Sequence, residues 1–223
     1  MPDRHAIPRV WEPGELDSPG LRLLGVIHSE RRRAPIWEAP SGGPVDAGLV
    51  RHRDLAALVY PGALRVDALD LDDVRAHHRR LESMLQRETV VPAPYGVAFR
   101  GEKEVVRFLR EQYTELGDAL VFVEGRWEFR LHLTPEEPDF PEALALDLAT
   151  HVYAELRKLA HAAVPFPRGE PRAFSSAFLV DRVGTRGFLE RVEELGAEHS
   201  DLALDATGPW PPYDFVRIRL EAP

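Results

Sequence analysis

Strand-like and helix-like hydrophobic patterns follow one another twice along this chain, and this order restricts its fold more than any other feature. In the first half, residues 21–27 (LRLLGVI) and 55–60 (LAALVY) are short apolar runs of the kind found in buried strands. Residues 48–52 are expected to form a hairpin with the second run, closed by Pro61-Gly62. Apolar side chains at every third or fourth position predict amphipathic helices at 70–87 and 102–120.

The second half repeats the mixture of strands and helices. Residues 126–133 (RWEFRLHL) alternate apolar and polar side chains, which predicts a strand with one buried face and one wet face. Residues 141–163 are expected to form a long helix, with a proline in its first turn and the proline-rich stretch 164–169 as its end. The remaining expected elements are strands at 173–180, 202–204 and 215–220 and a helix at 185–198.

Two successive α+β domains account for this order with short connections, so the expected fold class is α+β with two small α+β domains. We expect a flexible leader over residues 1–20, which hold four prolines and no periodic pattern. The N-terminal domain is expected over 21–101, and the C-terminal domain over 102–223 with an extended aromatic and proline-rich tail. Each half has about the length of a ferredoxin-like domain, although neither shows a clean βαββαβ order.

Composition excludes several classes of protein. The formal net charge of -9 disfavours a nucleic acid or an anionic membrane as partner, because both attract basic surfaces. The chain has no cysteine, which excludes disulfides and thiolate chemistry and favours the cytoplasm. It has neither an apolar run of about 18 residues nor a signal-peptide pattern, so we expect no membrane span and no secretion.

Motifs for catalysis are missing from the sequence. It contains no glycine-rich dinucleotide or phosphate loop, no H-E-x-x-H pair and no G-x-S-x-G turn. The adjacent His77 and His78 would point about 100° apart on a helix, which is unfavourable for binding one metal ion. We therefore expect no catalytic residue, no cofactor and no metal site.

Two places nevertheless carry candidate site residues. Tyr95 and Phe99 flank Gly96 after a proline-rich bend, where they could line a ligand pocket or close the core. Glu128 lies on the polar side of an aromatic-rich strand and is expected to pair with an arginine of a neighbouring element, which the sequence does not identify.

The most distinctive segment is Gly208-Pro-Trp-Pro-Pro-Tyr-Asp-Phe215. Its three prolines favour an extended backbone, while its aromatic side chains offer large surfaces with little rotamer entropy to lose. The segment resembles the G-P-W-P-P-Y-S-F signature of the gas vesicle GvpL/GvpF family, with Asp214 in place of the usual serine.

Other stretches are similar to the same family in the same order, from about residue 21 to 220. One departure is Pro94, which stands where the family usually has arginine. The similar stretches are Leu24–Ile27, Asp54–Val59, His77 with Leu81 and Glu82, Val90–Pro92, Tyr95–Phe99, Gly125 with Glu128, and Ala177–Asp181 with Phe188.

The resemblance implies an accessory structural or assembly protein of gas vesicles, non-catalytic and without a cofactor. It implies two α+β domains, the N-terminal one a modified ferredoxin-like domain. The implied partners are the small hydrophobic shell protein and other gas vesicle accessory proteins, and the implied location is the gas vesicle in the cytoplasm. Five aromatic residues are candidates for contact with a partner: Trp210, Tyr213, Phe215, Tyr95 and Phe99.

Two alternatives stay open at this point. The aromatic side chains of the signature could instead pack the tail onto the protein's own core. The whole chain could be a ferredoxin-like ligand-binding protein or enzyme, with a pocket near His77, Glu82, Tyr95 and Glu128.

Overall fold

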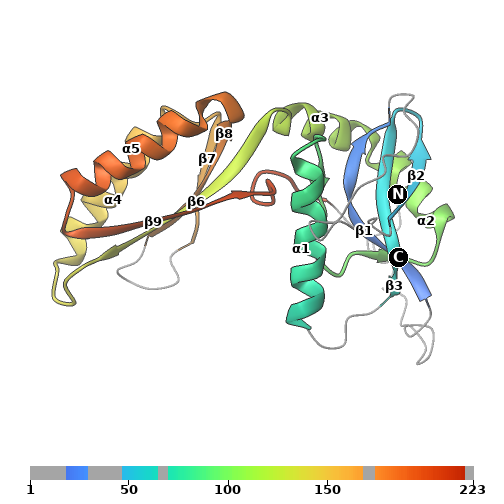
Figure 1. Cartoon of the computed structure of the whole chain (residues 1–223), viewed down its shortest axis with the longest axis horizontal. Helices are drawn as coiled ribbons and strands as arrows, with labels where there is room; N and C mark the ends of the chain where they lie inside the picture. Colours follow the sequence, from blue (N-terminus) through green and yellow to red (C-terminus); the bar gives the residue numbers. More distant parts are fainter. Residues whose placement is uncertain (1–18, 30–46, 65–69, 168–173, 219–223) are drawn as a thin grey trace, which may run out of the picture. The chain divides into compact units, whose positions relative to one another are not determined.

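The computed structural model describes residues 19–29, 47–64, 70–167 and 174–218. The chain divides into two compact units, Met1–Phe122 with Arg217–Pro223 and Val123–Val216. Both units contain strands and helices (Figure 1), which confirms the expected α+β class. Most of the expected leader lies outside the described residues, but Gly20 already belongs to a strand.

Antiparallel strands in the order β2-β3-β1-β4 form the sheet of the first unit, and β5 also pairs with β1. The side chains from Leu55 to Tyr60 on β3 and from Leu23 to Ile27 on β1 are buried without a break. Because successive side chains point to opposite faces, both faces of these central strands are covered. The strands are β1 (Pro19–His28), β2 (Gly48–His52), β3 (Leu55–Ala63), β4 (Val91–Pro92) and β5 (Ala98–Phe99).

Helices lie to either side of this sheet (Figure 1). The first, α1 (Leu71–Leu85), is capped by the Asp70 side chain, which accepts a hydrogen bond from the N–H of Asp72 at 2.8 Å. The expected helix at 102–120 is in fact two helices, α2 (Glu102–Glu111) and α3 (Tyr113–Val123), separated at Gln112. Because α2 packs on β2 and β3, the first unit continues past the expected boundary at residue 101 to Phe122.

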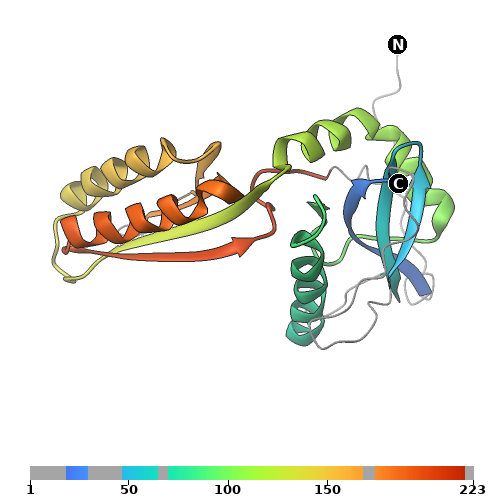
Figure 2. The ribbon, with the colours of Figure 1, turned by 45° about the horizontal axis from the view of Figure 1, so that its top comes forward.

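The second unit has the element order βαββαβ, which the sequence patterns had not revealed. Its sheet order is β7-β8-β6-β9 with every pair antiparallel, the arrangement of a ferredoxin-like domain. Both helices lie over one face of the sheet (Figure 2). The elements are β6 (Arg126–Pro135), α4 (Glu142–Arg157), β7 (Ala162–Pro165), β8 (Phe174–Asp181), the short 3-10 helix η1 (Arg182–Gly184), α5 (Thr185–Glu198) and β9 (Leu202–Trp210).

The sheet of the first unit follows the same strand order as that of the second. In both, the third strand of the sequence lies between the second and the first, and the fourth lies beyond the first. A helix joins the third strand to the fourth in each unit. Between β1 and β2 lie residues 29–47, most of which are outside the described residues. The first unit is thus a modified ferredoxin-like sheet.

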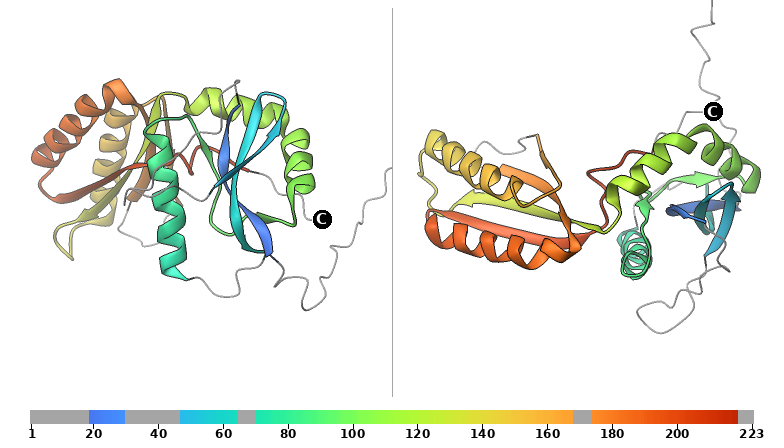
Figure 3. Two further views of the ribbon diagram at one scale, coloured as in Figure 1. Left: turned by 45° about the vertical axis from the view of Figure 1, so that its right-hand side comes forward. Right: turned by 90° about the horizontal axis from the view of Figure 1, so that it is seen from above.

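The core of the second unit lies between the sheet and the two helices (Figure 3). Phe129 and Leu131 of β6 point into it, and Phe178 of β8 stacks near Phe188 of α5 with ring centroids 5.4 Å apart. The alternate side chains of β6, which begin with Arg126 and include Glu128, lie on the other face of the sheet.

Three local expectations are corrected by the structure. The hairpin of β2 and β3 turns at Arg53-Asp54, and Pro61-Gly62 lies inside β3, where pairing with β2 has already ended and a missing N–H is tolerated. The helix expected over 141–163 ends at Arg157, because the following residues pair with β8 as the edge strand β7. No strand forms over 215–218, the described part of the last expected strand, whereas β9 runs on to Trp210.

Candidate functional site

The signature segment closes the second unit, and residues 208–216 are called the clasp segment below. Trp210 is the residue opposite Glu128 in the pairing of β9 with β6, next to an irregularity in the register. The chain then turns, with Tyr213 N–H donating to Pro211 O at 2.7 Å. Pro211 and Pro212 are buried, so the segment is fixed against the protein.

A cluster of charged groups joins the clasp segment to β6. Arg130 Nε donates to Glu128 Oε1 at 2.9 Å and to Asp214 Oδ2 at 2.8 Å. The backbone N–H of Asp214 donates to Glu128 Oε2 at 2.9 Å. The side chain of Glu128 is 0% exposed. The sequence analysis expected an arginine of a neighbouring element, but the arginine is Arg130, two residues along the same strand.

The environment of Glu128 favours its neutral form. Burial raises the pKa of Glu128 to about 8, and its hydrogen bond with the Asp214 side chain raises it as well. The backbone N–H of Asp214 and the charge of Arg130 act in the opposite direction. Near neutral pH Glu128 thus keeps its proton.

The three aromatic residues of the clasp segment are half-buried. Trp210 Nε1 donates to Thr207 Oγ1 at 3.0 Å, which fixes the indole beside β9. Tyr213 and Phe215 each keep part of their surface exposed. The segment therefore packs on its own unit and still presents aromatic surface to solvent.

The other two candidate aromatics lie in the first unit and differ from each other. Tyr95 is half-buried, and its hydroxyl donates to Asp73 Oδ2 at 3.2 Å. Phe99 is only 8% exposed, and its ring centroid lies 5.2 Å from that of Phe108 of α2. Phe99 is placed to stabilise the core of the unit, whereas Tyr95 has exposed surface.

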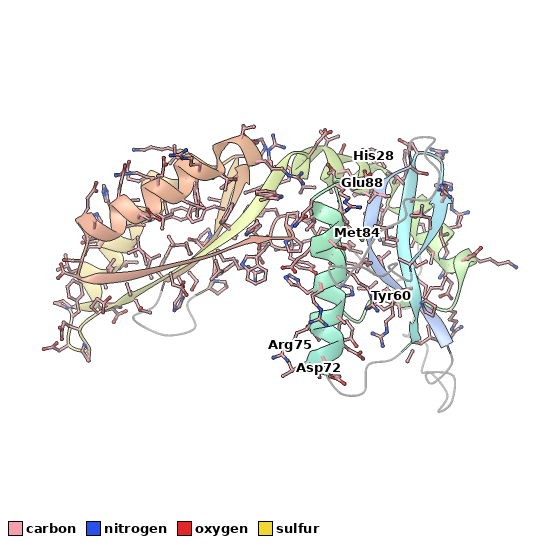
Figure 4. The ribbon with its side chains drawn as sticks, in the orientation of Figure 1. His28, Tyr60, Asp72, Arg75, Met84 and Glu88 are labelled. Atoms are coloured by element: carbon pink, nitrogen blue, oxygen red, sulfur yellow. The ribbon has the colours of Figure 1, made fainter. Side chains whose placement is uncertain are left out.

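His77 has both ring nitrogens occupied within the first unit. The backbone carbonyl of Ala93 can only accept, so Nε2 donates to it at 2.9 Å. The other nitrogen, Nδ1, then accepts from the hydroxyl of Tyr60 of β3 at 3.0 Å (Tyr60 is labelled in Figure 4). Burial lowers the pKa of His77, which agrees with a neutral structural imidazole.

The alternative pocket is not assembled within either unit. Glu82 lies 3.3 Å from His78 Nε2 and not beside His77. Glu128 belongs to the second unit, whereas His77 and Tyr95 belong to the first. Of the four residues named for that pocket, His77 and Tyr95 are neighbours, with ring centroids 5.6 Å apart.

Replacing His77 with Phe is expected to lower the free energy of unfolding by about 2–3 kcal/mol, because the Tyr60 hydroxyl and the Ala93 carbonyl lose their partner. In the unmutated chain, His77 binds a proton more readily in the unfolded state than in the folded state, where burial lowers its pKa. Stability is therefore lost as the pH falls below about 6.5. The variant should lose this part of the pH dependence, measured by urea unfolding between pH 5 and 7.5.

The neighbouring His78 offers the control for that experiment, because its ring is partly exposed. The variant His78→Gln should change stability by less than about 0.5 kcal/mol and keep the pH dependence. Equal losses of stability in the two variants would contradict the view that the loss in His77→Phe comes from the hydrogen bonds of His77.

Sequence reasoning missed Asp214 and Tyr60 as partners of the candidate residues. For Arg130 a signal existed, since it shares the polar face of β6 with Glu128 at a spacing of two. For Asp214 none existed, because 86 residues separate it from Glu128.

Among the described residues, no group of three or more His, Cys, Asp or Glu side chains could hold a metal ion. In the same part of the chain, no helix has both the length and the apolar character needed to cross a membrane.

Two ferredoxin-like α+β units, the second closed by a proline and aromatic-rich segment, define the class of this protein. The family model described as gas vesicle synthesis protein GvpL/GvpF matches residues 25–147 and 142–217. The chain belongs to the GvpL/GvpF family, as the resemblance of its sequence implied. Its role is therefore connected with gas vesicles.

Named relatives and solved structures agree with this assignment. Gas vesicle protein F1 of Halobacterium salinarum is 30% identical over 155 residues, which are 68% of this chain and 72% of that protein. Gas vesicle protein L of a Streptomyces species is 24% identical over 225 residues, covering 78% of this chain and 84% of that protein. The crystal structure of GvpF from Anabaena shares the fold with a TM-score of 0.75 at 16% identity, over 91% of this chain and 98% of that one.

Proposed function

We propose that this protein is a non-catalytic accessory protein of gas vesicle formation that binds the small hydrophobic shell protein. Membership of the GvpL/GvpF family supports the connection with gas vesicles. The observation that supports binding is the clasp segment, where Trp210, Tyr213 and Phe215 are half-buried on a segment fixed by two buried prolines. Aromatic side chains held in this way lose little rotamer entropy on contact with an apolar partner.

Burial of apolar surface is the mechanism that this arrangement favours. The partner would cover the exposed parts of the three aromatic rings and exclude water from them, without forming or breaking bonds. Tyr95 is a further contact residue in this proposal, whereas Phe99 supports the core. The other proposed partners are gas vesicle accessory proteins, and the proposed location is the gas vesicle in the cytoplasm.

The variant Trp210→Ala is expected to weaken binding of the shell protein at least about tenfold, because it removes a half-buried indole, the largest side chain of the segment, from the proposed contact surface. A pull-down with purified shell protein, followed by titration, measures this effect. Thermal unfolding of the variant is measured in parallel, so that a loss of binding can be separated from a loss of fold.

Trp127 provides the matched control, since it is a half-buried tryptophan of the same unit, with the Arg182 guanidinium 5.1 Å from its ring centroid. The variant Trp127→Ala should lower stability and leave binding by the folded fraction intact. Unchanged binding by Trp210→Ala, or equal losses in both variants, would refute the assignment of the clasp segment as the contact surface.

A further inference from the structure

The clasp segment is held on β6 by two carboxyl groups that face a single guanidinium group. Arg130 Nε lies within 2.9 Å of an oxygen of Glu128 and 2.8 Å of an oxygen of Asp214. With both carboxyl groups ionised, the cluster would hold an extra negative charge where Glu128 is fully buried, which is unfavourable. One bound proton makes the cluster neutral.

The other charged groups on this face do not supply the missing positive charge. Arg126, two residues before Glu128 on β6, pairs with Asp181 of β8 at 3.0 Å. The strand neighbours of Glu128 are Leu179 of β8 and Trp210 of β9, neither of which has an acid or base to titrate near neutral pH.

The remaining neighbours on this face are also accounted for. His132, beyond Arg130 on β6, shares a hydrogen bond of 2.6 Å with Ser175 Oγ. On β7, Ala162 is opposite Leu179, so that strand brings no charge to the cluster. Among the described residues, the acids that contact Arg130 are therefore Glu128 and Asp214.

We propose that Glu128, Arg130 and Asp214 form a latch that is closed by one proton. With the proton bound, Asp214 and the clasp segment stay on β6. When the proton leaves, the two carboxylates repel each other and the clasp segment is released. Asp214 is the group that moves, because its side chain is 23% exposed on an irregular segment, whereas Glu128 is 0% exposed on a central strand.

The direction of the pH effect follows from linkage. The closed latch keeps a proton on Glu128 up to a pKa of about 8, whereas release of the clasp segment exposes the carboxyl group to water and lowers its pKa toward the ordinary value of 4.5. Closure is thus complete at low pH and weakens as the pH rises between these two values. Since the segment carries the aromatic residues assigned to the partner, the consequence for binding rests on the proposed function.

Hydrogen exchange of the full chain at pH 6 and pH 9 tests the latch. After correction for intrinsic exchange rates, opening of residues 208–216 should increase at least about tenfold at the higher pH. Exchange within α4 should change much less and is the internal reference. In Glu128→Gln and Asp214→Asn, which each remove one ionisable carboxyl group and keep its shape, the increase should disappear.

Opening that is independent of pH in the native chain overturns the latch, and so does an undiminished increase in both variants. The two variants are made separately, so that one remains informative where the other does not fold. Because no shell protein is present in this experiment, its failure leaves the proposed function standing. A latch that opens as expected in a chain that does not bind the shell protein would refute the proposed function alone.

Discussion

Replacing Arg130 with Met is expected to lower the free energy of unfolding by about 2–4 kcal/mol at pH 8. The guanidinium is the cation that both Glu128 and Asp214 contact, and without it the fully buried carboxyl group of Glu128 faces Asp214 alone. The Arg130 side chain is itself 41% exposed, so the expected loss is at the lower side of what a fully buried ion pair shows. Chemical unfolding at pH 8 and pH 6 measures it.

The pH dependence and two further variants make this expectation specific. The loss should be smaller at pH 6, where Glu128 holds its proton, and adding Glu128→Gln to Arg130→Met should recover part of the stability. Arg186→Met is the control, because Arg186 is 90% exposed and pairs with Glu190 on the surface of α5. It should change stability by less than about 1 kcal/mol. A control effect as large as that of Arg130→Met would contradict the special role of the cluster.

Elements with a strong local pattern could be predicted from the sequence. The apolar runs at 21–27 and 55–60 are buried strands, and the periodic segment 70–87 contains α1. In these segments local preference and tertiary packing agree. The α+β class followed from their order.

Elements that depend on tertiary pairing could not be predicted in the same way. Ala162 and Ala163 favour a helix by propensity, yet they form β7 because β8 offers them an antiparallel partner. The break at Gln112 between α2 and α3 is marked by neither Gly nor Pro in the sequence. The βαββαβ order of the second unit became visible only once β7 was separated from α4.

The candidate site shows the same division. Glu128 and the clasp segment were both singled out from their sequence context, but nothing local connects them. Their contact is made by the backbone N–H and the side chain of Asp214, which follows Glu128 by 86 residues in the sequence. It depends on the path of β9 beside β6. The sequence could therefore single out Glu128 and the clasp segment, but not the contact between them or the part of Asp214 in it.

The path of β9 depends in turn on Gly208, and Gly208→Ala is expected to lower the free energy of unfolding by about 3–5 kcal/mol. Gly208 has φ = +139°, a conformation that residues with a side chain rarely adopt. A Cβ there would lie 2.9 Å from the carbonyl oxygen of Glu128 and 2.9 Å from Cδ1 of Phe129, so backbone and core would both have to shift. Thermal and chemical unfolding of the variant measure the loss.

Gly187 of α5 gives this experiment a control of opposite sign. A Cβ at Gly187 meets nothing within 4 Å, so Gly187→Ala should stabilise the helix by about 0.5–1 kcal/mol. Because the strain at Gly208 is local to the clasp segment, Gly208→Ala should also increase hydrogen exchange at residues 208–216 more than within α4. Native stability in Gly208→Ala would mean that β9 can reach β6 by another backbone path, and the clasp segment would then not depend on this glycine.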